Sequence, residues 1–285
     1  MKLTDQVYYR KMYFSMPVKA GPLLREVYAA LLKGDKNVLV DCGVSYNYPD
    51  IVQLAAEAEL TVSDIDAIIV THCHADHTGG IARLKRENPA LKVWAHPLCR
   101  PMVEDIDNQY RVRPVPAFST IMGGAVQIDR DLEDGEIIDI GFPLQVVFTP
   151  GHSADSLSLY LPEQKVLLSG DAIPCINDLP IYEDLEAERA TLEKLRAYPA
   201  RRIISGFCGL WDQSRQPEIF ALTDDYLARI QTAVDRFMRE NPQKALVEMG
   251  VYVIGQLGLQ ALPIPIFLTS LKEHMKVYEG KGCMK

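Results

Sequence analysis

The sequence lacks any concentration of positive charge. Its 285 residues include 30 Lys and Arg against 38 Asp and Glu, which gives a net charge of −8, and its densest basic stretch is ARR at residues 200–202. A groove that binds nucleic acid usually carries more positive charge than this. The composition therefore disfavours nucleic acid as a partner and favours a small-molecule substrate.

Features of exported proteins are also scarce. The first residues, MKLTDQVYYRKMYF, include no apolar run of the length found in signal peptides. The six cysteines are scattered along the chain, without the short spacings of a disulfide framework. We therefore expect reduced thiols in a cytoplasmic protein.

One long uncharged stretch, MGVYVIGQLGLQALPIPIFL at residues 249–268, has the length of a membrane-spanning helix. Pro263 and Pro265 would interrupt a single helix there, and two glutamines add polar groups. We therefore expect no membrane span. The stretch favours a buried helical element or a contact between subunits, such as a homodimer formed through the C-terminal helices.

Predicted strands and helices alternate along most of the chain. Short apolar runs predict strands, and apolar residues three or four positions apart predict helices. The predicted strands are residues 37–43, 65–70, 91–96, four more between 136 and 170, and 201–206, and the predicted helices are residues 49–60, 78–88 and 184–198.

The C-terminal region has a different pattern. A stripe of apolar residues with a helical period runs from Ile219 to Phe237, and few strand signals follow it. We therefore expect a mixed α/β catalytic domain over residues 1–212 and a helical C-terminal extension over residues 213–285. Residues 109–127 show no clear periodicity, which predicts a loop that forms either a wall of the substrate pocket or a surface excursion.

Three of the six histidines and one aspartate lie within six positions in the stretch THCHADHTGG. In an extended segment the side chains of His72 and His74 point the same way, while that of Cys73 points away. Asp76 continues this spacing, and His77 follows where the chain turns into a predicted helix. Neutral imidazole and carboxylate are ligands of Zn²⁺, and also of Fe and Mn. The cluster predicts one or two metal ions, with histidines at a surface loop as the alternative.

Two further candidate ligands follow predicted strands later in the chain. His152 comes after the strand LQVVF, Asp171 comes after the strand VLLSG, and a glycine directly precedes each. Metal sites in enzymes normally draw their ligands from several strand ends. With the first cluster, these two residues would complete a shell for two metals.

Together these motifs resemble those of the metallo-β-lactamase superfamily. THCHADHTGG, TPGHSADSLSLY and LLSGDAI are similar to its successive motifs, and the resemblance covers about residues 37–206. It implies an α/β fold, a four-layer αβ/βα sandwich with metals at one edge. It also implies a set of ligands: His72, His74 and His152 for the first metal, Asp76 and His77 for the second, and Asp171 bridging both.

The sequence departs from the family pattern at one place. Phe207, in IISGFCGLWD, stands where family members usually carry the last histidine ligand, and phenylalanine cannot coordinate a metal. Cys208 could supply a thiolate, although a buried cysteine is more often an apolar filler. His96 and His274 are more typical of packing or surface residues. The second metal is therefore expected to be weaker, differently held or absent.

The resemblance implies a metal-dependent hydrolase. In such an enzyme a metal-activated hydroxide attacks an ester, thioester, lactone or related acyl group, and Asp76 orients the nucleophile and carries a proton. Two alternatives remain open. One is a single-iron oxidoreductase similar to persulfide dioxygenases, with His72, His152 and Asp171 as ligands. The other is a protein without enzymatic activity that has a degenerate site.

Overall fold

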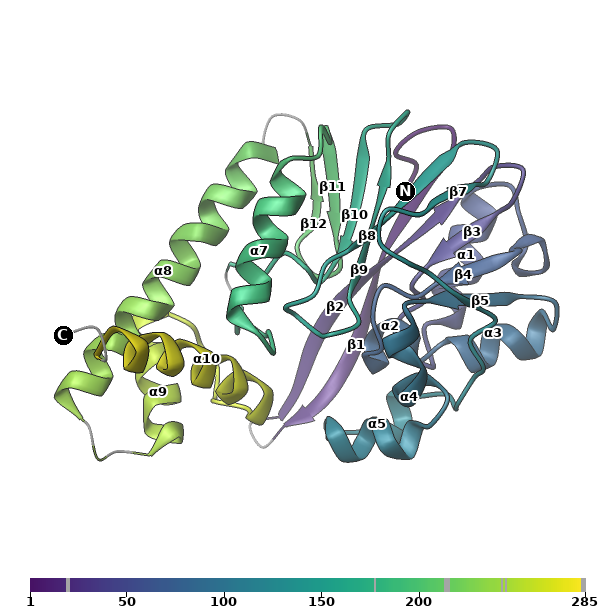
Figure 1. The fold of residues 1–285 in the computed structure, drawn as a ribbon. Coiled ribbons are helices and arrows are strands. Elements are labelled where there is room, and N and C mark those ends of the chain that lie inside the picture. The colour runs from purple at the N-terminus through teal and green to yellow at the C-terminus, as the bar shows by residue number, and fades with distance from the viewer. Residues whose placement is uncertain (19–20, 177, 213–215, 242, 244, 283–285) are drawn as a thin grey trace. The chain divides into compact units, whose positions relative to one another are not determined.

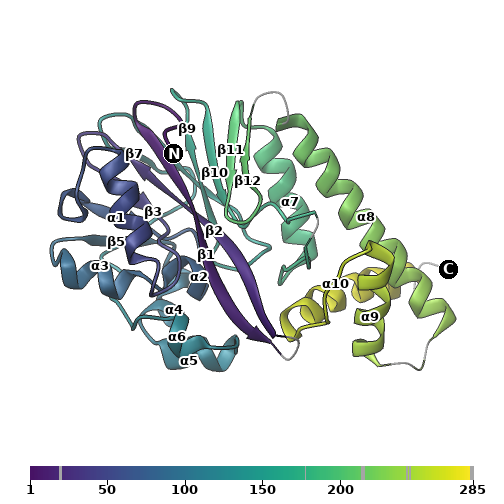
Figure 2. The same ribbon diagram turned by 180° about the vertical axis from the view of Figure 1, so that it is seen from behind.

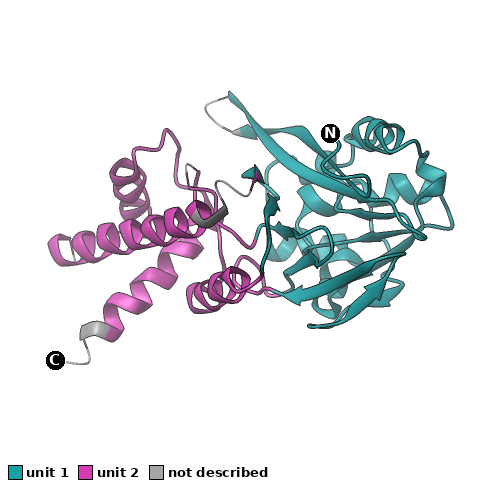
Figure 3. Cartoon of the chain, turned by 90° about the horizontal axis from the view of Figure 1, so that it is seen from above, with its two compact units in different colours: residues 1–148, 155–171, 199–210 teal, residues 149–154, 172–198, 211–285 magenta. Residues whose placement is uncertain are grey.

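The computed structural model describes residues 1–18, 21–176, 178–212, 216–241, 243 and 245–282. The chain divides into two compact units, shown in different colours in Figure 3. The first unit contains Met1–Phe148, Asp155–Asp171 and Pro199–Leu210, and the second contains Thr149–Ala154, Ala172–Tyr198 and Trp211–Lys285. The units therefore interleave along the chain, whereas the sequence predicted a single boundary after residue 212.

A six-stranded mixed sheet, sheet A, takes its strands in the order in which they occur in the chain (Figure 1). The first two strands form a long antiparallel hairpin, the third pairs antiparallel with the second, and the remaining strands run parallel to the third. The strands are β1 (Val7–Val18), β2 (Gly21–Leu32), β3 (Val38–Val40), β4 (Ala67–Ile69), β5 (Lys92–Ala95) and β6 (Arg130–Asp131).

A second six-stranded sheet, sheet B, is built from the later part of the chain in the order β12-β11-β10-β9-β8-β7. Its strands are β7 (Ile137–Asp139), β8 (Pro143–Phe148), β9 (Leu157–Leu161), β10 (Val166–Gly170), β11 (Arg202–Ser205) and β12 (Gly209–Trp211). The pairs from β7 to β10 are antiparallel, and β10 pairs parallel with β11. Both sheets are therefore mixed.

Successive side chains of a strand point to opposite faces of the sheet. In the core strands of sheet A, both of these faces are buried. In β3, Val38 and Val40 join a core that also contains Leu144, Leu159 and other residues of sheet B, so the two sheets pack face to face. Leu39, between them, belongs to the core on the other face of sheet A.

Helices cover that other face of sheet A (Figure 2). Ile51 and Leu54 of α1 and Ile81 and Leu84 of α3 are buried in the same core as the outward side chains of the sheet. The helices of the first unit are α1 (Tyr48–Glu57), α2 (Ala75–Thr78), α3 (Ile81–Glu87), α4 (Arg100–Val103), α5 (Ile106–Val112) and α6 (Phe118–Ile121), with short 3-10 helices at Val62–Asp64 and Pro97–Cys99.

The second unit is helical. It contains α7 (Leu185–Arg196), α8 (Gln216–Glu240), α9 (Leu246–Leu257) and α10 (Pro265–Gly282). The apolar stripe predicted from the sequence is the buried face of α8, on which Ile219, Tyr226, Ile230, Ala233 and Phe237 are all buried. This helical C-terminal region and the two mixed sheets confirm the predicted fold class.

The uncharged stretch at residues 249–268 does not form one helix. It contains the end of α9, a segment without helix and the beginning of α10, and Gly258 ends α9 in the left-handed conformation at φ 71°. Among the described residues, no helix has both the length and the apolar character needed to cross a membrane. Val253 and Ile254 of α9 are buried, which bears out the predicted buried helical element. Val251 on the same helix is exposed, and a contact between subunits stays a prediction.

Each strand and helix predicted after residue 37 overlaps an observed element, but the helix predicted for residues 78–88 begins only at Ile81, as α3, after α2 has ended at Thr78. The loop predicted for residues 109–127 is wrong in part, because this stretch contains the end of α5 and all of α6. The β1–β2 hairpin was not predicted. Five of the six cysteines are free thiols, and Cys283 lies outside the described residues.

Candidate metal centre

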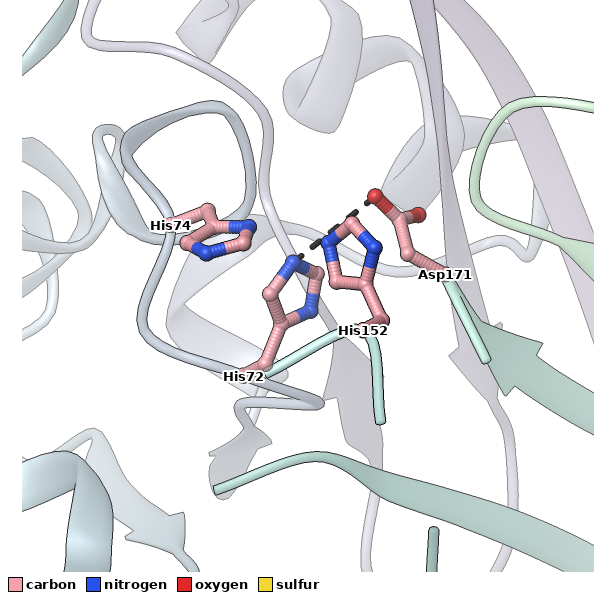
Figure 4. Close-up of side chains that lie close together, drawn as sticks. All are labelled: His72, His74, His152 and Asp171. Atoms are coloured by element: carbon pink, nitrogen blue, oxygen red, sulfur yellow. Dashed lines mark ion pairs between the residues drawn. The ribbon is translucent and has the colours of Figure 1, made fainter. Parts of the chain in front are cut away.

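The ends of several strands supply the side chains of the candidate site. The chain leaves β4 for the segment that carries His72 and His74, leaves β8 for the segment that carries His152, and leaves β10 directly for Asp171. One possible ligand atom from each of these four residues lies within 4.8 Å of the other three, and all four residues are buried. Figure 4 shows their side chains converging.

Asp171 faces two histidines with its two carboxylate oxygens. Its Oδ2 lies 3.7 Å from Nε2 of His72, and its Oδ1 lies 3.4 Å from Nε2 of His77. The imidazole rings of His72 and His77 lie 4.1 Å apart between centroids, and those of His72 and His74 lie 4.3 Å apart. The Asp171 carboxylate therefore lies close to both His72 and His77.

Outer hydrogen bonds fix which nitrogen of each ring faces the site. The Thr71 hydroxyl donates to Oδ2 of Asp41 at 2.8 Å, so its oxygen accepts from Nδ1 of His72 at 3.0 Å. Nδ1 of His77 donates to the same Asp41 carboxylate at 2.8 Å, and Nδ1 of His152 donates to the carbonyl of Ile181 at 2.7 Å. In all three rings Nδ1 carries the proton, which leaves the Nε2 lone pair for a metal.

Asp41 therefore holds two residues of the site at once. Its Oδ1 also accepts from the backbone N–H of Thr71 at 2.9 Å. The residue is buried and has a left-handed backbone, with φ of 57°, which aspartate tolerates better than most residues. Sequence reasoning missed this role, although the position of Asp41 at the end of the strand VLVD was a signal for it.

The surroundings of His77 favour a positive charge at this position. Burial by itself lowers the pKa of His77, but the carboxylates of Asp171 and Asp41 outweigh burial and raise the pKa well above its ordinary value. A buried pair of carboxylates thus attracts positive charge, and a metal ion can take the place of the proton.

The donor set fits a transition metal. Tetrahedral Zn²⁺ with bonds of roughly 2.0–2.1 Å has ligand atoms about 3.4 Å apart, close to the spacings around Asp171. Three imidazoles and one carboxylate are ligands that Zn²⁺, Fe and Mn accept. The four-residue group can therefore hold a metal ion, and its chemistry does not specify which one.

Two further side chains fix the backbone between His72 and His74. The backbone N–H of Cys73 donates to Oδ2 of Asp155 at 2.8 Å, and the carbonyl of Cys73 accepts from the amide of Gln109. The Cys73 side chain belongs to the buried core, as its predicted direction away from the histidines requires. Asp155 and Gln109 were not predicted as site residues, because their contacts with Cys73 span 82 and 36 positions of sequence.

The residues predicted for a second metal are only partly brought together. His77 is buried beside Asp171, whereas Asp76, the preceding residue on α2, is half-buried, and neither belongs to the four-residue group. Their roles as ligands stay predictions.

The turn after β11 leaves little space near Asp171. A Cβ atom at Gly206 would lie 2.0 Å from Oδ1 of Asp171, so only glycine fits there. The Phe207 ring lies 6.1 Å from the His77 ring, and the guanidinium of Arg25 stacks 4.9 Å from the Phe207 ring. The backbone N–H of Cys208 donates to the Ser205 hydroxyl, and this thiol is not part of the four-residue group.

The remaining histidines have structural surroundings. His96 stacks on Phe148 at 4.5 Å and accepts from the backbone N–H of Leu98 at the start of a 3-10 helix. His274 is buried on α10, where it contacts Tyr182 and Gln231.

Comparisons with known proteins agree with this architecture. The chain is 26% identical over 216 residues to an atrochrysone carboxyl ACP thioesterase of Aspergillus fumigatus, which covers 75% of this chain and 56% of that protein. It is 30% identical over 179 residues to a hydroxyacylglutathione hydrolase of Brucella ovis, which covers 62% of this chain and 60% of that protein. The chain thus spans about half to three fifths of the length of the curated relatives that it matches.

A solved structure shows the same fold over nearly the whole chain. A metallo-beta-lactamase family protein from Thermus thermophilus superimposes with a TM-score of 0.75 at 20% sequence identity, covering 99% of this chain and 95% of that one. The sequence profile of the metallo-beta-lactamase superfamily matches residues 23–206, which include all six predicted metal ligands. The chain therefore belongs to the metallo-beta-lactamase superfamily.

Proposed function

We propose that this protein is a metal-dependent hydrolase of small acyl compounds, with thioesters as the first class to test. The observation that carries the proposal is the buried group of His72, His74, His152 and Asp171, whose ligand atoms lie within 4.8 Å of one another. Burying three imidazoles beside a carboxylate is costly unless a cation is bound among them. This group is a candidate site for Zn²⁺, with Fe and Mn as alternatives.

A bound divalent metal lowers the pKa of a coordinated water toward neutrality and stabilises negative charge that develops on the attacked group. The residues of this chain orient that chemistry. Nε2 of His72 and of His152 are fixed toward the site by the Thr71 hydroxyl and the Ile181 carbonyl. Asp171, whose Oδ2 lies near His72 and whose Oδ1 lies near His77, would hold a metal together with these histidines.

Asp76 is the proposed proton carrier. It follows His74 on α2 and is only half-buried, so its carboxylate is more accessible than the four-residue group. Such a carboxylate can accept a proton from the attacking water and deliver it to the leaving group. This role requires no serine or cysteine nucleophile.

The names of the relatives support the reaction class. One is named as a thioesterase and another as a hydrolase of hydroxyacylglutathione. Both names describe removal of an acyl group by water, which motivates testing acyl substrates before phosphodiesters. The acidic composition, with a net charge of −8, also favours a small molecule over nucleic acid.

The test combines metal analysis with a substrate panel. Protein purified without chelators should contain zinc, and it should hydrolyse a thioester faster than matched ester, lactone and phosphodiester substrates. His152→Ala should remove metal and activity together. His96→Ala is the matched control and should retain both, because His96 lies at another strand end and caps a 3-10 helix.

Two results would contradict the proposal. One is a protein that takes up no Zn²⁺, Fe²⁺ or Mn²⁺ when these ions are supplied. The other is about one equivalent of iron together with oxygen consumption and no hydrolysis, which would establish the oxidoreductase alternative.

A further inference from the structure

Helix α10 contacts Tyr182, the residue that follows Ile181 in the chain. The carbonyl of Ile181 is the hydrogen-bond partner of His152. Ser270 and His274 lie one helical turn apart on this helix, and both contact Tyr182. The Ser270 hydroxyl accepts from the backbone N–H of Tyr182 and donates to its carbonyl, each at 2.9 Å. Nε2 of His274 lies 2.5 Å from the Tyr182 hydroxyl. All three side chains are buried.

The protons of this cluster can be assigned from its partners. The Gln231 amide nitrogen donates to the His274 carbonyl at 3.1 Å and to Asp235 at 2.6 Å, so the Gln231 oxygen faces the His274 ring. That oxygen accepts from Nδ1 of His274 at 2.7 Å. Nε2 of His274 then has a lone pair and accepts from the Tyr182 hydroxyl. This assignment gives both ring nitrogens of His274 a hydrogen-bond partner without requiring a charge on the ring.

A single peptide group joins this cluster to the candidate metal ligand. The peptide between Ile181 and Tyr182 accepts from Nδ1 of His152 at its carbonyl and donates to Ser270 at its N–H. A peptide that donates on one side is a stronger acceptor on the other, because hydrogen bonds in a chain polarise one another. Its orientation also decides where the His152 ring points.

Other contacts hold the backbone beside His152 without touching its ring. The Gly151 carbonyl accepts from the backbone N–H groups of Glu183 and Asp184, and the Pro150 carbonyl accepts from the Thr191 hydroxyl at 2.7 Å. These bonds fix the path of the chain. The Ile181 carbonyl, by contrast, contacts the ring itself at Nδ1.

We propose that Ser270 and His274 are positioning residues for His152, acting through the Ile181–Tyr182 peptide. The C-terminal helix thereby tunes how tightly a metal is held, although it supplies no ligand. The inference rests on the metal centre of the proposed function.

Ser270→Ala tests the proposal, with Thr269→Ala as its matched control. Thr269 is the neighbouring residue of α10 and is exposed, and its hydroxyl donates only to the Pro265 carbonyl of its own helix. Replacing an outer partner of a metal-binding histidine typically costs about 10–100-fold in metal affinity. Because Ser270 acts through one intervening peptide, we expect the lower end, a dissociation constant for Co²⁺ raised about tenfold. Thr269→Ala should leave that constant unchanged.

A proton signal separates positioning from general loss of structure. In the Co²⁺ protein, the Nδ1 proton of His152 should give a shifted, exchangeable resonance that is absent in His152→Ala. Ser270→Ala should increase the exchange rate of this proton with solvent. Tyr182→Phe, which keeps the backbone contacts and removes only the bond to His274, should have the same effect to a smaller degree. It therefore gives a second test if Ser270→Ala fails to fold.

The outcomes separate this inference from the proposed function. Equal Co²⁺ affinity and equal proton exchange in Ser270→Ala, Tyr182→Phe and Thr269→Ala would overturn the positioning role even if the enzyme hydrolyses acyl substrates. Weaker binding and faster exchange without hydrolysis of any substrate would support the positioning role and contradict the hydrolase. Failure of the unaltered protein to bind any of Co²⁺, Zn²⁺, Fe²⁺ and Mn²⁺ would overturn both.

Discussion

At the scale of single residues, Asp41 forms hydrogen bonds both with Thr71, which precedes His72, and with His77. It accepts hydrogen bonds from the backbone and hydroxyl of Thr71 and from the ring of His77. It thereby fixes the Nε2 atoms of His72 and His77 toward Asp171, although Asp41 is not itself in the four-residue group. The state of this one carboxylate therefore affects both candidate metal positions.

Asp41→Asn tests this role. Asparagine also tolerates the left-handed backbone, but its amide nitrogen cannot accept a hydrogen bond and would face a donor. We expect metal affinity to fall about 10–100-fold and the free energy of unfolding to fall by about 1–3 kcal/mol. Metal content after dialysis and urea unfolding measure the two effects. Unchanged metal content would contradict the role.

His96 gives a prediction on pH. Burial lowers the pKa of His96 in the folded chain. As pH falls, the unfolded chain takes up a proton near the ordinary pKa, and the folded chain takes it up only at a lower pH. The folded state thus loses stability as pH falls through about 6.5 toward that lower value. His96→Asn keeps an acceptor for the N–H of Leu98 and removes the titration. When the pH is lowered from 7.5 to 5, the melting temperature of the variant should increase relative to that of the parent protein. A difference in melting temperature that stays constant over this range would contradict the prediction.

The site residues that could be predicted from the sequence belong to local motifs, whereas those that could not be predicted contact the site from distant positions in the chain. His72, His74 and His77 share one local motif, and His152 and Asp171 each follow a strong strand signal. Asp155 and Gln109, by contrast, act on the Cys73 backbone from far along the chain. Isolated polar residues carry no local pattern, so only the folded arrangement identifies them.

At the scale of elements, the hairpin of β1 and β2 and the short helix α6 were not predicted. In β1 neighbouring residues resemble each other in pairs, as in Tyr8–Tyr9 and Arg10–Lys11, which hides the alternation expected of a strand. Twelve pairs of residues between β1 and β2 stabilise the hairpin instead. The helix α6 has only four residues, too few to show a helical period. By contrast, α7 was predicted because Leu185, Leu192 and Leu195 mark its buried face.

The beginning of α7 depends on one cap. The Asp184 carboxylate accepts from the backbone N–H of Ala187 at 2.9 Å, which satisfies a donor that the first turn leaves open. Asp184→Ala should lower the free energy of unfolding by about 1 kcal/mol. Asp184→Asn should recover most of this loss because its side-chain oxygen can also accept. Urea unfolding measures both variants, and equal losses would show that the cap is not the cause.

At the scale of the whole molecule, a bound metal should stabilise the folded chain. Only the folded chain gathers the four ligands, so metal at 100 times its dissociation constant would add about 2.7 kcal/mol to the free energy of unfolding. We expect a chelator to lower the melting temperature by about 5 °C. Zn²⁺ should restore it and Mg²⁺ should not, because Mg²⁺ prefers oxygen ligands. An unchanged melting temperature after verified metal removal would contradict this expectation.

The order of strands in the two sheets has a consequence for synthesis on the ribosome. Every strand of sheet A lies before residue 132 and every strand of sheet B after residue 136, so sheet A can pair while the rest of the chain is still emerging. Its inner face, with Val38 and Val40, has no covering layer at that stage. His72 and His74 are then already synthesised, but the four-residue group is complete only once His152 and Asp171 have followed them, so the proposed metal site can form only after sheet A has paired.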